Sequence, residues 1–295
     1  MTNLLDVFRF FDEYDFLKAR LSFMRNEFDD SRVRSCSIAF VPTTANNGSL
    51  NNVNRLLLDS LCDKYPRFRY VIFDIPSIWL ESSARSAEDF CFEYISSYVR
   101  RLLCCESFYD VVSFSDLDEI FDRSLFVDAL QWLPTSPVVF AKMLSCYYRL
   151  DVVAQEDWPG TFFFAPGLLD SFSLGTLKYS AHHPLRKENT IYGGAHLSYF
   201  MSTLNSKVVN SHFVRGHQIR LLIASFGLHP FLRSYRMYAI PPAVDPSIAE
   251  HFAHLQQRPV VSLAPFIRKL FIYSKADRFV LLIYLLARFF SSALR

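Results

Sequence analysis

Apolar residues in the first half of the chain come in short runs that alternate with amphipathic stretches. Residues 4–11 (LLDVFRFF), 35–42 (SCSIAFVP) and 70–76 (YVIFDIP) have the pattern of buried strands, the second of them ending at Pro42. Between the first two, apolar residues are spaced by four, three and four from Leu17 to Phe28, which predicts a helix that Asp12 caps.

The same alternation continues into the middle of the chain. An amphipathic helix is predicted at 88–103 and another at 124–133, with a strand before the second helix and further strands within 137–152 and 161–166. This order predicts an α/β fold with a mostly parallel sheet flanked by helices. In such sheets ligands bind beyond the carboxyl ends of the strands.

Three carboxylates follow the strand that begins near Tyr109, in the sequence SFSDLDEIF. Asp116, Asp118 and Glu119, which we call the acid cluster, stand among residues that belong in a core. Two interpretations fit this spacing. Acids at a strand end can hold Mg²⁺ or Mn²⁺ together with phosphate oxygens, or they can stand before the helix at 124–133 and interact with its dipole.

Composition limits the class of protein. The chain has 295 residues, is 51% hydrophobic and carries a net charge of +2, so it is long enough for a large core and gives no charge argument for a nucleic-acid partner. Its six cysteines form no CxxC pair, and its N-terminus has no pattern of a signal peptide. We therefore expect reduced thiols and a cytoplasmic protein.

Five blocks of sequence, in order, resemble glycosyltransferase family 17, whose members include the β-1,4-mannosyl-glycoprotein N-acetylglucosaminyltransferases. The blocks are FRFFDEYDFLKARL, DVVSFSDLDEI, YYRLDVVAQEDWPG, LRKENTIYGGAHLSYF and SKVVNSHF. The resemblance implies a GT-A fold, built on a Rossmann-like sheet, and an inverting transfer from a UDP-sugar, in which GlcNAc is the expected sugar, to a glycan or glycolipid acceptor. It also implies Mn²⁺ or Mg²⁺ as cofactor.

The resemblance assigns roles within the acid cluster and around it. It places Asp118 on the metal and Asp116 on the metal or the donor ribose, with His212 as a further metal ligand. Glu119 either orients the other two acids or contacts the donor sugar. Arg186, Lys207 and Arg215 become candidate partners of the diphosphate. No acid follows Phe40 at the end of the second strand, where the family often has one, so Thr43, Thr44 or Asn46 are the candidate contacts to the nucleoside.

Two residues are candidates for the general base. His196 follows Gly193 and Gly194, whose missing side chains allow a close backbone approach to a ligand. Asp157 is the rival, and Trp158 beside it is either a sugar-stacking ring or a core residue. Ala195 stands where Trp is typical of the family. The family commonly has a carboxylate soon after the residue that matches His212, and this chain has none there.

We expect a catalytic domain at 1–245 and a C-terminal helical extension at 246–295. The tail is basic and apolar, and its apolar stretch at 279–287 is too short to span a bilayer, so it suits either a membrane surface or a protein surface. The competing function is a degenerate glycosyltransferase-like binding or scaffold protein at a membrane, which the missing carboxylates would explain.

Overall fold

The structure is a computed structural model that describes most of the first two thirds of the chain and one later helix. The described residues are 1–11, 13–30, 32–44, 54–82, 84–147, 150, 153–154, 158–179, 189–198 and 242–256. The chain divides into two compact units, and the first consists of Met1–Leu144, Asp157–His196 and Val244–Phe252. The second consists of Ser145–Glu156, Leu197–Ala243 and Ala253–Arg295, and most of it lies outside the described residues.

Within the described residues the chain forms eight strands, seven α-helices and two 3₁₀ turns. The strands are β1 (Thr2–Arg9), β2 (Val33–Thr44), β3 (Phe68–Ile75), β4 (Val111–Asp116), β5 (Glu119–Ile120), β6 (Val138–Tyr147), β7 (Trp158–Phe164) and β8 (Thr190–Ser198). The helices are α1 (Tyr14–Phe28), α2 (Arg55–Lys64), α3 (Ser77–Ser82), α4 (Ala84–Cys105), α5 (Arg123–Trp132), α6 (Leu174–Tyr179) and α11 (Pro246–Phe252), with 3₁₀ turns η1 (Pro166–Asp170) and η3 (Ala253–Leu255).

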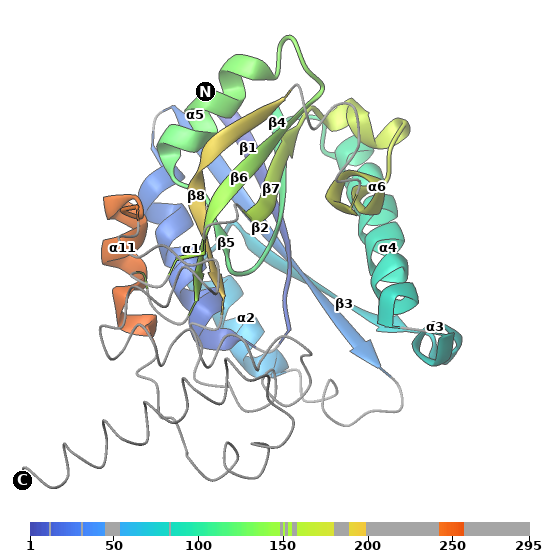
Figure 1. The fold of residues 1–295 in the computed structure, drawn as a ribbon. Coiled ribbons are helices and arrows are strands. Elements are labelled where there is room, and N and C mark those ends of the chain that lie inside the picture. Colours follow the sequence, from blue (N-terminus) through green and yellow to red (C-terminus); the bar gives the residue numbers. More distant parts are fainter. Residues whose placement is uncertain are drawn as a thin grey trace, which may run out of the picture. The chain divides into compact units, whose positions relative to one another are not determined.

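The strands form one sheet in the order β3-β2-β1-β4-β7-β6-β8-β5. The first four are parallel, whereas β7 is antiparallel to β4 and β6, and β5 is antiparallel to β8. The predicted α/β class is therefore confirmed, but the sheet is mixed rather than mostly parallel, because parallel pairing is confined to β1, β2, β3 and β4. Helices lie on both faces: α1 and α11 cover one, and α4 and α6 cover the other (Figure 1).

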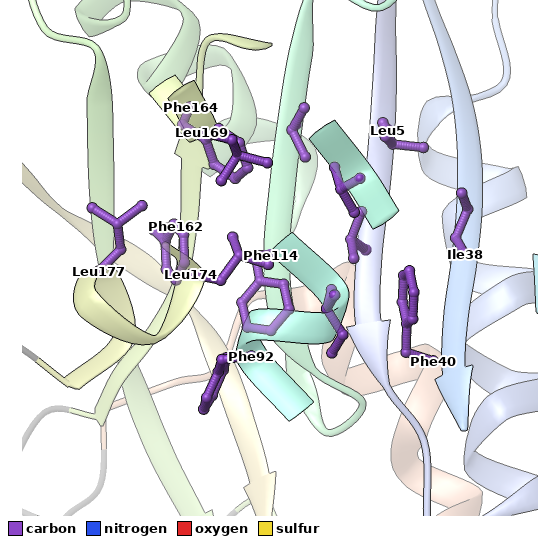
Figure 2. Close-up of a cluster of buried hydrophobic side chains, with 14 of the residues drawn as sticks. Leu5, Ile38, Phe40, Phe92, Phe114, Phe162, Phe164, Leu169, Leu174 and Leu177 are labelled. Carbon is purple, nitrogen blue, oxygen red and sulfur yellow. The ribbon is translucent and has the colours of Figure 1, made fainter. Parts of the chain in front are cut away.

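The face beneath α4 and α6 holds a continuous aromatic and aliphatic core (Figure 2). Leu5 and Val7 point into it because alternate residues of a strand share a face. Phe114 of β4 lies between Phe92 of α4 and Phe162 of β7, with ring centroids 5.7 and 5.5 Å away. This packing fixes the end of β4, and with it the position of the acid cluster.

Two local predictions need correction. Strand β2 does not end at Pro42 but continues to Thr44. Beyond Phe40 it pairs with β3 alone, so the missing N–H of Pro42 is tolerated there. Helix α1 begins at Tyr14, and Glu13 rather than Asp12 occupies the N-cap position; Asp12 lies outside the described residues.

The start of the predicted tail forms α11, which packs on α1. Phe252 stacks on Phe16 with ring centroids 5.2 Å apart. Nε2 of His251 forms a hydrogen bond of 3.0 Å with the carbonyl oxygen of Ala19. Residues 257–295 lie outside the described part of the chain, so a separate tail and its membrane surface stay predictions. None of the helices within the described ranges is both long and apolar enough to cross a membrane.

Candidate functional site

The acid cluster lies where the strand order of the parallel sheet reverses. From β1 the chain adds β2 and then β3 on one side, and β4 returns to the other side of β1. Arg9 ends β1 and Asp116 ends β4, and the two residues are partners in the parallel register. In open α/β sheets this switch point, at the carboxyl ends of the strands, is where ligands bind.

Apolar neighbours hold the turn that carries the acids. Phe114, Leu117, Ile120 and Phe121 are each at most 3% exposed. Burying one such side chain contributes about 1.5–3 kcal/mol, so the four together outweigh the repulsion of about 4 kcal/mol between two unit charges 4 Å apart near a protein surface. The core residues therefore hold the turn in place despite the repulsion between its carboxylates.

A buried arginine of helix α1 connects that helix to the turn that carries the acids. Arg20 of α1 is 1% exposed and forms an ion pair with Asp6 of β1 at 2.9 Å. Its Nη1 donates to three carbonyl oxygens of the turn, those of Asp116, Leu117 and Glu119, at 3.2, 3.0 and 2.8 Å. Because these carbonyls are all bonded to one guanidinium, the backbone of the turn has a fixed shape.

Asp116 is ion-paired to two cations. Arg9 donates to its Oδ1 from Nε at 2.7 Å and from Nη2 at 2.6 Å, and Lys178 of α6 lies 3.3 Å from its Oδ2. Burial works against ionisation of Asp116, but Arg9 and Lys178 outweigh it and hold its pKa well below the usual range. Arg9 also binds Glu88 of α4 at 2.7 Å, so α4 is joined to the same network.

Glu119 is fully buried, and donors meet both of its oxygens. Lys178 and the indole N–H of Trp158 donate to Oε1 at 2.6 and 2.7 Å, and the backbone N–H of Asp116 donates to Oε2 at 3.0 Å. Burial lowers the pKa of Lys178, but Asp116 and Glu119 more than offset this and raise it. We call Arg9, Asp116, Glu119 and Lys178 the edge network.

Asp118 faces a histidine from a distant part of the chain. Strand β8 is antiparallel to β5 and sets His196 opposite Glu119, so that Nε2 of His196 lies 3.6 Å from Oδ2 of Asp118. The imidazole ring stacks on Trp158 with centroids 4.1 Å apart and planes 19° apart, and its Nδ1 is buried. The predicted base is thus next to the acid cluster, and Trp158 packs against its ring.

The glycine pair lies within β8 and packs against protein. Gly194 has φ +72°, and a Cβ there would lie 2.6 Å from the carbonyl oxygen of Ile120 and 2.8 Å from Cε of Met143. A Cβ at Gly193 would lie 3.1 Å from Leu125. These contacts explain the glycines by the close approach of β8 to β5 and α5. The contact to a ligand that we expected from them stays a prediction.

The remaining predicted residues divide into those the structure places and those it does not describe. The hydroxyl of Thr43 donates to Asp74 of β3 and to the carbonyl oxygen of Phe73, at the same carboxyl edge of the sheet. Asp122, rather than the acid cluster, caps α5 by accepting from the backbone N–H of Leu125. Lying outside the described residues are Asn46, Asp157, Arg186, Lys207, His212 and Arg215.

The fit to a metal ion is partial. Within the described ranges no group of three His, Cys, Asp or Glu side chains is arranged to hold a metal. All four carboxylate oxygens of Asp116 and Glu119 accept from protein donors, so of the three acids Asp118 is the one outside the edge network. That Asp116 binds a metal stays a prediction. A metal ion there would compete with Arg9 and Lys178 for the same carboxylate.

Sequence reasoning missed Arg9, Arg20 and Lys178, although two of them left a signal. Arg20 lies three positions after Leu17 and four before Met24, inside the apolar stripe of α1. Lys178 follows the buried Leu174 by four positions and adjoins the buried Leu177. A charged residue within a buried helical stripe indicates a buried ion pair.

The comparisons with known proteins are weak. No protein-family model matches the chain and no curated protein does, so membership of glycosyltransferase family 17 is not shown. Among solved structures, the chain is similar to residues 1–349 of TarS from S. aureus, with a TM-score of 0.33, 10% identity, and coverage of 58% of this chain and 48% of that one. The chain thus spans about half the length of that TarS structure.

A second similar structure is mouse xyloside xylosyltransferase 1 in its apo form. The TM-score is 0.32 at 13% identity, over 58% of this chain and 69% of that chain. At these TM-scores neither likeness carries an argument about this chain.

Proposed function

We propose that the chain is a glycosyltransferase that moves a sugar from a nucleotide-sugar donor to a glycan or glycolipid acceptor. The observation that carries the proposal is the pairing of Arg9 with Asp116 at the switch point of the sheet, where nucleotide ligands of open α/β folds bind. The five blocks that resemble glycosyltransferase family 17 support the same class, with UDP-GlcNAc as the proposed donor.

The proposed chemistry is an inverting transfer with a histidine as general base. In such a transfer the acceptor hydroxyl oxygen bonds to the anomeric carbon as the diphosphate leaves, and the hydroxyl proton goes to the base. Nε2 of His196 is the candidate, because it lies beside the acid cluster, 3.6 Å from Oδ2 of Asp118. Asp157, outside the described residues, remains the alternative base.

A divalent cation, Mn²⁺ or Mg²⁺, belongs to the proposal as the cofactor. When bound, it would supply positive charge for the departing diphosphate. Asp118 is the described residue proposed to hold it, and His212, outside the described residues, is the proposed second ligand. We also propose, from the sequence alone, a cytoplasmic location with the basic tail on a membrane surface.

A second candidate function is a nucleotide- or glycan-binding scaffold without turnover. The observation that favours it is the internal pairing of Asp116 and Glu119, whose four carboxylate oxygens all accept from protein donors. Acids whose oxygens all accept hydrogen bonds from the protein can maintain the structure of a binding site without taking part in a reaction.

One experiment separates the two candidates. The protein is incubated with Mn²⁺ and a panel of UDP- and GDP-sugars, and both donor hydrolysis and thermal shift are recorded. The enzyme is expected to hydrolyse one donor slowly, to lose this in Asp118→Asn, and to keep it in Asp128→Asn, a matched change at an exposed carboxylate of α5. A thermal shift without hydrolysis would favour the scaffold, and no shift with any nucleotide would exclude both the enzyme and a nucleotide-binding scaffold.

A further inference from the structure

Lys178 is the side chain that joins two acids of the cluster. It lies on α6, is 7% exposed, and places its Nζ 3.3 Å from Oδ2 of Asp116 and 2.6 Å from Oε1 of Glu119. An ammonium is a compact point charge with three donors, so it can serve two carboxylates at once. A metal ion bridging the same two carboxylates would require this position.

Donors already meet every carboxylate oxygen of this pair. Oδ1 of Asp116 accepts from Arg9, Oδ2 from Lys178, and Oε1 of Glu119 from both Lys178 and Trp158. Oε2 of Glu119 accepts from the backbone N–H of Asp116. A metal ion at these oxygens would displace hydrogen bonds to charged groups, each of which contributes about 1.5–3 kcal/mol.

Cations of the protein already lie against both carboxylates of the pair. The two negative charges of Asp116 and Glu119 face the positive charges of Arg9 and Lys178 at 2.6–3.3 Å. A divalent ion that approached these carboxylates would also be repelled by both cations. Asp118 is not part of this group of ion pairs, and its Oδ2 lies 3.6 Å from Nε2 of His196.

We infer that Lys178 is a resident cation, in the place that a metal ion would otherwise take between Asp116 and Glu119. The protein without nucleotide therefore has no divalent-cation site at these two acids. A cation at Asp118 would have a single protein carboxylate from the cluster, so its binding depends on phosphate oxygens brought by a ligand. This inference refines the proposed function but stands on the ion pairs alone.

The test is a titration of the full-length protein with Mn²⁺, followed by electron paramagnetic resonance, with no nucleotide or sugar present. Lys178→Met is expected to bind Mn²⁺ about tenfold more tightly than the wild-type protein, because two carboxylates lose their counter-ion. Lys178→Arg, which keeps the charge, is expected to match the wild type. The double variant Lys178→Met with Glu119→Gln is expected to lose the gain.

Two results would overturn the inference. One is an unchanged Mn²⁺ affinity in a folded Lys178→Met protein. The other is saturable Mn²⁺ binding by the wild-type protein that Glu119→Gln abolishes, and this measurement decides the matter even where Lys178→Met does not fold. Because neither titration contains a sugar nucleotide, failure of the proposed glycosyl transfer leaves both results interpretable.

Discussion

Two groups of ion pairs meet at the turn after β4, and they differ in what they bind. The buried pair, Asp6 and Arg20, is at most 1% exposed and bonds backbone carbonyls of the turn. The edge network binds side chains instead, and its Asp116 carboxylate is 22% exposed. The buried pair fixes the backbone of the turn that carries the acids. The edge network provides the counter-charges of Asp116 and Glu119.

The comparison teaches that acids in one short turn can have separate tasks. Glu119 is buried and accepts from Lys178, Asp116 is partly exposed and pairs with Arg9, and Asp118 faces His196. A motif of closely spaced acids therefore does not imply that all of them bind one ligand. The following predictions disturb one side of the comparison at a time.

Removing the buried arginine is expected to have the largest effect. Arg20→Met leaves Asp6 charged and buried and three carbonyls without their donor, so we expect a loss of about 3–5 kcal/mol in the free energy of unfolding. Urea denaturation measures it. Combining it with Asp6→Asn is expected to recover part of the loss, and a single variant that loses less than about 1 kcal/mol would contradict the role of this pair.

A methyl group at Gly194 is expected to disturb the edge side through β8. Gly194→Ala would place its Cβ 2.6 Å from the carbonyl oxygen of Ile120 at a φ of +72°, and we expect about 1–3 kcal/mol of destabilisation. Gly167→Ala is the control, because no atom lies within 4 Å of its Cβ. Equal unfolding free energies for the two variants would show that the close approach is not limiting.

Removing the indole donor is expected to weaken the edge network without unfolding it. Trp158→Phe keeps an aromatic ring against His196 but loses the N–H that donates to Glu119 at 2.7 Å. Loss of one hydrogen bond to a charged acceptor costs about 1.5–3 kcal/mol. Because Lys178 still donates to the same oxygen, we expect the free energy of unfolding to fall by about 1.5 kcal/mol. Thermal unfolding measures the change, and an increase in stability would contradict the contact.

The edge network is expected to give a stability that is flat near neutral pH. The lowered pKa of Asp116 stabilises the fold above the ordinary Asp value of about 3.9, and this is lost as pH falls through the folded value. The raised pKa of Lys178 stabilises it below about 10.4, and this is lost as pH rises beyond that. Urea unfolding from pH 2 to pH 7 should show a shallower slope below about pH 3.9 in Asp116→Asn than in the wild type.

Much of the fold could be predicted from local patterns. The spacing of apolar residues gave α1 and α4, and the short apolar runs gave β1 to β4, because one buried face imposes its period on the sequence. The acid cluster was placed at a strand end for the same reason. The antiparallel pairings of β7 with β4 and of β8 with β5 were not predicted, since these strands lie far apart in the sequence.

The partners within the site could not be read from the sequence. Lys178 is separated from Glu119 by 59 positions, and Arg9 from Asp116 by 107. No local period encodes such pairings, and a Lys or Arg taken alone is usually an exposed charge. His196 was singled out by its glycines, but its position beside Asp118 follows from the register of β8 on β5.

Calorimetric titration of UDP in the presence of Mn²⁺ tests most directly whether the carboxyl edge between β1 and β4 holds a nucleotide. The wild-type protein and Asp128→Asn are expected to bind UDP alike, and Asp118→Asn is expected to bind about tenfold more weakly or not at all, since Asp118 is the carboxylate proposed to meet the cation beside the diphosphate. UDP binding that is the same in all three proteins, or absent from the wild type, would contradict the account.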